Sequence, residues 1–186
     1  KNMIDKYISL LRLGSKIKKA VAKCEIELEK AFLLMQLDDV ERDIVWRVLF
    51  RESSTNINET KETIRNLLDL KQIKQMGMVE LLSSKEISLI ISDSKSNKRQ
   101  RGERIYILIK YMRYPVISKK EDEFDKSCSE LGLDNDVRIN HSRYFEGDEI
   151  RITIKVSNEE KLRANIEKLL SNIGNGMFKK IFSIFK

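Results

Sequence analysis

Apolar residues recur along the first half of the chain at the three- and four-residue spacing that places them on one face of a helix. This spacing runs through NMIDKYISLLRL, SKIKKAVAK, EIELEKAFLLMQL, DDVERDIVWRVLFRE and NETKETIRNLLDLKQIKQ. Helix starts are marked as well: Asp38 stands three residues before Glu41, as in a capping box, and Asn56 can cap the next helix. Residues 1–92 are therefore predicted to form short antiparallel helices around one core.

Apolar residues vanish between Ser92 and Gly102, where the chain reads SDSKSNKRQRG. This small, polar and basic composition is typical of a linker, which we place at 93–103. A phosphate-contacting arm is the alternative interpretation of the same charges.

The second half combines helical and alternating patterns. ERIYILIKYMRYP keeps helical spacing as far as Pro115, whereas VRINHSRYFEGDEIRITIKV alternates as two strands around a loop that contains Gly147. A further helix, NEEKLRANIEKLLSNI, follows. We therefore expect a mainly α protein with a small α+β part: a helical domain, then an αββα domain at 104–175 and a basic amphipathic tail at 176–186.

A single two-stranded ribbon is marginal in water, so its apolar face and its edges need partners. A second copy of the chain is the simplest supplier, and we expect a C2 dimer with a shared sheet. The candidate dimerisation residues are Val137, Ile139, Ile150, Ile152, Ile154, Val156, Leu162, Ile166 and Leu169. In the tail, the stripe formed by Phe178, Ile181, Phe182 and Phe185 is expected to pack against this module, with an interfacial membrane anchor as the alternative.

The formal charge is +7, from 36 Lys and Arg against 29 Asp and Glu, which favours a polyanionic partner. Catalytic chemistry has little support in the sequence. The only histidine, His141, is in phase with Val137 and Ile139, which indicates a partly buried ring, and the two cysteines lie far apart. We expect no enzyme activity, no metal and no cofactor. No signal peptide or membrane span is recognisable, so a cytoplasmic location is expected.

The run from Ser15 to Leu68, SKIKKAVAKCEIELEKAFLLMQLDDVERDIVWRVLFRESSTNINETKETIRNLL, resembles the segment after the helix-turn-helix of ParB-type partition proteins, which bind centromere sites on bacterial chromosomes and plasmids. VRINHSRYFEGDEIRITIKVSNEEKLRANIEKLL is similar to that family's strand-strand-helix dimer module. The resemblance implies that NMIDKYISLLRL is all or part of a recognition helix. The family's N-terminal nucleotide-binding domain, which uses CTP in relatives, has no counterpart here, and we assign no nucleotide to this chain.

The resemblance implies a DNA-binding partition protein for plasmid or chromosome segregation. Its expected partners are double-stranded DNA, a second copy of the chain, and a ParA-type ATPase that binds an upstream region; its expected location is on the nucleoid or plasmid. A helix-turn-helix transcriptional regulator is one alternative, and a membrane-surface or scaffold module that uses the basic tail is another. The candidate DNA-binding residues are Lys1, Asn2, Lys6, Lys16, Lys18, Lys19, Lys98, Arg99 and Arg101.

Overall fold

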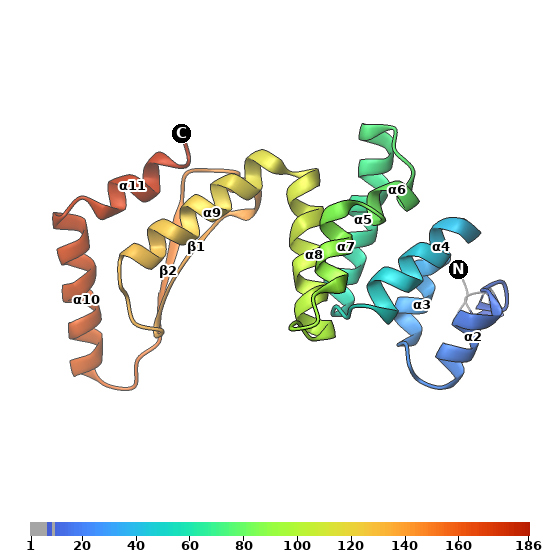
Figure 1. The fold of residues 1–186 in the computed structure, drawn as a ribbon. Coiled ribbons are helices and arrows are strands. Elements are labelled where there is room, and N and C mark those ends of the chain that lie inside the picture. The colour runs from blue at the N-terminus through green and yellow to red at the C-terminus, as the bar shows by residue number, and fades with distance from the viewer. Residues whose placement is uncertain (1–6, 9) are drawn as a thin grey trace. The chain divides into compact units, whose positions relative to one another are not determined.

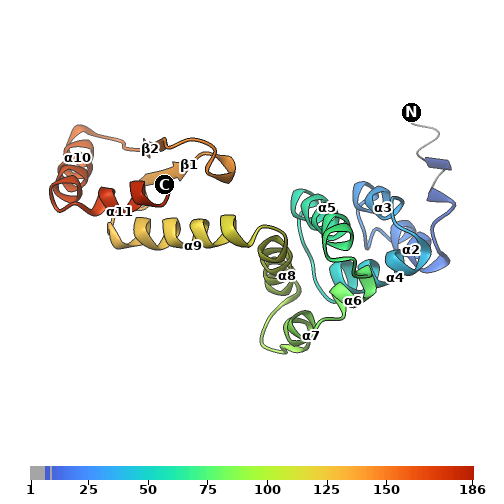
Figure 2. The ribbon, with the colours of Figure 1, turned by 90° about the horizontal axis from the view of Figure 1, so that it is seen from above.

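A computed structural model of the chain describes residues 7, 8 and 10–186, which are mainly helical with one small antiparallel sheet (Figures 1 and 2). They divide into an N-terminal unit that ends at Arg113 and a C-terminal unit, Tyr114–Lys186. Each unit has its own hydrophobic core. The expected fold class is thus confirmed at this level.

The N-terminal unit is a bundle of short helices. Its predicted capping boxes are present, since Asp38 and Asn56 each accept a hydrogen bond from the backbone N–H of a glutamate three residues on, and each glutamate bonds back. The helices are α2 (Ser15–Ala22), α3 (Leu28–Leu34), α4 (Asp39–Val45), the π-helical turn η1 (Trp46–Arg51), α5 (Ile57–Lys74), α6 (Met78–Leu82), α7 (Lys85–Ser92) and α8 (Lys98–Arg113).

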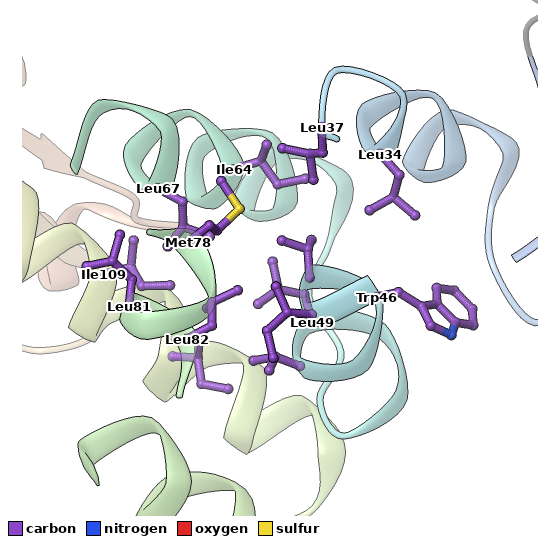
Figure 3. Packing of buried hydrophobic residues seen from close by; sticks show 14 of the residues in the cluster. Leu34, Leu37, Trp46, Leu49, Ile64, Leu67, Met78, Leu81, Leu82 and Ile109 are labelled. Atoms are coloured by element: carbon purple, nitrogen blue, oxygen red, sulfur yellow. The ribbon is translucent and has the colours of Figure 1, made fainter. Parts of the chain in front are cut away.

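Aliphatic side chains from these helices meet in one core (Figure 3). Leu34 of α3, Leu49 of η1 and Leu67 of α5 are almost completely buried in it. Trp46 lies at the edge of the cluster, where its ring stacks on that of Phe50 with the centroids 5.7 Å apart. The spacing of apolar residues in the sequence therefore predicted a shared core between these helices.

The prediction of a linker between two domains at 93–103 is wrong. The helix α8 begins at Lys98 and packs along α5 within the N-terminal unit. At the start of α8, where the sequence lacks apolar residues, polar contacts hold the helix in place. The Arg104 guanidinium binds Asp93 at 2.7 Å, and the backbone N–H of Ser54 donates to the Lys98 carbonyl at 2.9 Å. Gly102 adds a close approach to Ser54 that a side chain would prevent. The boundary between the units lies instead after Arg113.

The C-terminal unit contains α9 (Pro115–Glu130), strands β1 (Val137–His141) and β2 (Ile150–Ile154), a short turn η2 (Arg143–Phe145), α10 (Glu159–Gly174) and α11 (Met177–Ser183). The strands form the predicted hairpin, with Ile139 opposite Ile152 and His141 opposite Ile150. Between them, Tyr144 and Phe145 both adopt positive φ angles, which bulky residues seldom do.

The chain's own helices supply part of the cover for the hairpin. Phe124 of α9 and Phe178 and Ile181 of α11 join Val137 in one buried cluster. The expected packing of the tail is therefore confirmed for Phe178 and Ile181, which are buried, and for Phe185, which is partly buried, whereas Phe182 remains exposed. Lys180 also binds Glu130 at 2.5 Å, which lowers the pKa of that carboxyl and fastens α11 to α9.

Candidate nucleic-acid interface

The lysines of α2 form the clearest cationic surface among the predicted DNA-binding residues. This helix has no acidic residue, and it buries Ile17 and Ala20 while Lys16, Lys18 and Lys19 remain exposed. Lys18 donates to the Leu11 carbonyl at 3.3 Å. The amphipathic pattern of α2 thus directs all three charges away from the core. Lys1, Asn2 and Lys6 lie outside the described residues.

The predicted cations at the start of α8 have a different role. Lys98 is exposed, but Arg99 pairs with Glu59 of α5, its Nη2 lying 2.6 Å from Oε1. This hydrogen bond lowers the pKa of Glu59. Arg101 donates to the Ile91 carbonyl at 3.0 Å. The two arginines therefore hold α8 against its neighbours instead of standing free for a ligand.

Two arginines that sequence analysis overlooked lie close to α2. Arg47 and Arg51 of η1 line a cleft of about 500 Å³ together with Lys16. Their four-residue spacing in WRVLFR was a usable signal, but the stretch was interpreted only as a core helix. That Lys16, 31 residues before Arg47, lines the same cleft follows from the tertiary fold.

The predicted dimerisation residues fall into two groups in the C-terminal unit. The first group packs within the subunit, where two members are buried and three are partly buried: Val137 and Leu169, and Ile139, Ile150 and Ile154. The second group is exposed: Ile152, Val156, Leu162 and Ile166. A second copy was expected to supply the cover for the apolar face of the hairpin, whereas α9 and α11 of the same chain already supply part of it.

The exposed face of α10 extends further than expected. Leu170 and Ile173 are exposed and, with Leu162 and Ile166, continue one stripe along the helix. Both edges of the two-stranded sheet are also unpaired among the described residues. On the hairpin face opposite the apolar one, Arg138, Arg151 and Lys155 are exposed.

Histidine and cysteine, residue types often used in catalysis, occur at His141, Cys24 and Cys128. His141 is half-buried, its ring stacked on Phe145 at 4.0 Å and its Nδ1 2.6 Å from the Ser142 carbonyl. Both cysteines are free, and burial raises the pKa of the Cys128 thiol to about 11. Within the described residues, no three His, Cys, Asp or Glu side chains gather where they would hold a metal ion.

Comparisons with known proteins add no relative: no family model, no curated protein and no solved structure matches the chain. In residues 7, 8 and 10–186, none of the helices combines the length and the apolar character that crossing a bilayer requires.

Proposed function

We propose that this chain is the DNA-binding and dimerising part of a ParB-like partition protein. The acid-free lysine surface of α2 is the observation that carries the proposal. Lysines on the solvent side of one helix suit contacts with DNA phosphates, which give affinity and orientation without reading sequence. The helix-turn-helix assignment of residues 1–12 and the centromere site belong to the same proposal and rest on the sequence resemblance.

The proposed dimer uses the exposed stripe of α10 in the C-terminal unit. Four large apolar residues on one helix face form an unusual surface for an isolated subunit, and a two-fold axis lets the same stripe serve both copies. Exposed Ile152 and Val156 on or just after β2 extend the apolar surface. A dimer would present two copies of α2 to the DNA, as a two-fold-symmetric site requires.

Two alternatives remain distinct from partition. A transcriptional regulator would use the same DNA-binding surface, and a ParA-type ATPase gene beside this one would favour partition. A membrane-surface module would need the apolar stripe of α11 for lipid, but Phe178 and Ile181 are buried in the protein core, which favours the DNA proposal.

Salt dependence of duplex binding tests the proposal. Each phosphate contact contributes about 0.9 to the slope of log K against log salt concentration. The triple variant K16A/K18A/K19A is expected to lower the magnitude of that slope by up to about 2.7, three contacts at about 0.9 each. Fluorescence anisotropy with a labelled duplex measures it.

A control with the same change of charge is K61A/K74A/K85A, which removes three exposed lysines from α5 and α7. This control should retain the wild-type slope. If the wild-type chain fails to bind duplex DNA at low salt, or if both triple variants show the same slope, the DNA-binding proposal is wrong.

A further inference from the structure

A cleft in the N-terminal unit gathers cations from two separate segments. It has a volume of about 500 Å³ and lies among α2, α4, η1 and α6. Lys16, Arg47 and Arg51 line it together with one carboxylate, Asp43, and with Trp46 and Val79. Three cations thus face a single acidic group, which leaves the η1 cleft with an excess of positive charge.

The three cations of the cleft differ from other basic side chains of this unit in their hydrogen bonding. Among the described residues, the side chains of Lys16, Arg47 and Arg51 make no hydrogen bond or ion pair. Other arginines of the unit do: Arg42 binds Asp39 at 2.5 Å, and Arg99 binds Glu59. Two guanidinium groups beside a cleft with their donors free are suited to an external anion.

The π-helical turn determines where the two arginines stand. The backbone N–H of Glu52 donates to the Arg47 carbonyl at 3.0 Å, five residues back, and the buried Ser53 hydroxyl donates to the Val48 carbonyl at 2.7 Å. Trp46 stacks on Phe50 within the same turn. A π-helical turn is rare and frequently occurs at a functional site. Here it holds Arg47 and Arg51 beside Lys16.

We propose that the η1 cleft binds a phosphodiester of the duplex DNA backbone. The guanidinium forks of Arg47 and Arg51 match phosphate oxygens, while the apolar walls at Trp46 and Val79 suit the sugar carbons. Lys16 belongs both to the cleft and to α2, so the DNA backbone follows one continuous basic surface. This inference rests on the proposed function, because it assigns a second contact to the same DNA.

The double variant R47Q/R51Q of the full chain tests the inference on a labelled duplex. Loss of one phosphate contact should lower the magnitude of the salt slope by about 0.9. Loss of two charge-assisted hydrogen bonds should weaken binding at about 0.1 M salt by about tenfold or more. The variant R47K/R51K should keep a slope near the wild-type value yet bind more weakly, because lysine lacks the bidentate fork.

The matched control is K61Q/R65Q, which removes two exposed charges with the same four-residue spacing from α5. It should bind like the wild type. If R47Q/R51Q binds with the slope and affinity of this control, the cleft inference is wrong while the DNA-binding proposal stands. If the wild type does not bind duplex DNA, both fail. Circular dichroism melting checks the fold, and if R47Q/R51Q is unfolded, wild-type affinity of R47K/R51K overturns the inference.

Discussion

Replacing Gly102 by alanine is expected to destabilise the N-terminal unit by about 3 kcal/mol or more, at the upper end of the cost of overpacking. A Cβ at this position would lie 2.6 Å from the Ser54 carbonyl carbon and closer still to its oxygen. Real Cβ atoms essentially never come so near. Because both partners are backbone groups, no side-chain rotation can relieve the clash.

Neighbouring contacts keep α8 from moving away from Ser54 to relieve the clash. The Ser54 N–H is bonded to the Lys98 carbonyl one turn before Gly102, while Ile105 and Ile109 are buried in the core one and two turns after it. Moving the helix outward would strain that hydrogen bond and expose both isoleucines. The clash is therefore expected to cost packing energy along α8 as well as local strain.

Urea denaturation followed by circular dichroism measures the effect of G102A. The control is G174A, at the end of α10, where an added Cβ has nothing within 4 Å. Alanine there should be neutral or stabilising by up to about 1 kcal/mol, since it favours the helix. Equal stability of G102A and the wild type would show that α8 does not approach Ser54 in solution.

The double variant I166E/L170E is expected to turn a dimeric protein into a monomer with a folded C-terminal unit. Ile166 and Leu170 are 42% and 60% exposed in the subunit, so glutamate can be solvated there without disturbing the core. In the proposed dimer each side chain occurs twice, and a buried apolar side chain contributes about 1.5–3 kcal/mol. The dissociation constant of the dimer should therefore rise by about a thousandfold or more.

Sedimentation equilibrium at concentrations on the order of 10 μM distinguishes the two states. A suitable control is V116E, because Val116 on α9 is 68% exposed and lies outside the α10 stripe. It should remain a dimer. A monomeric wild type would refute dimerisation, whereas an I166E/L170E dimer would move the interface away from α10, for example to the open edges of the hairpin.

Sequence analysis predicted the elements that local chemistry specifies. The caps at Asp38 and Asn56 mark the starts of α4 and α5, because a side-chain acceptor satisfies N–H groups within the next turn. The hairpin follows from alternation, and the inward face of α2 from helical spacing. The exposure of Lys16, Lys18 and Lys19 could be predicted for the same reason.

Contacts between distant segments could not be predicted in this way. The start of α8 was mistaken for a linker because its contacts use Gly102 and arginines, and no local pattern indicates that Arg99 binds Glu59 forty residues earlier. The same limit hid the η1 cleft, since only the packed tertiary structure places Arg47 and Arg51 around one cleft with Lys16.

Apolar pattern alone also left open which isoleucines the subunit buries. Ile139 and Ile166 are equally hydrophobic, yet Ile139 packs in the core of the C-terminal unit, whereas Ile166 faces solvent. Hydrophobicity predicts that burial of a side chain is favourable, but it does not predict which surface covers that side chain. Local helices, strands and caps are thus encoded within a few residues, whereas the unit boundary, the cleft and the exposed α10 stripe depend on how those elements pack together.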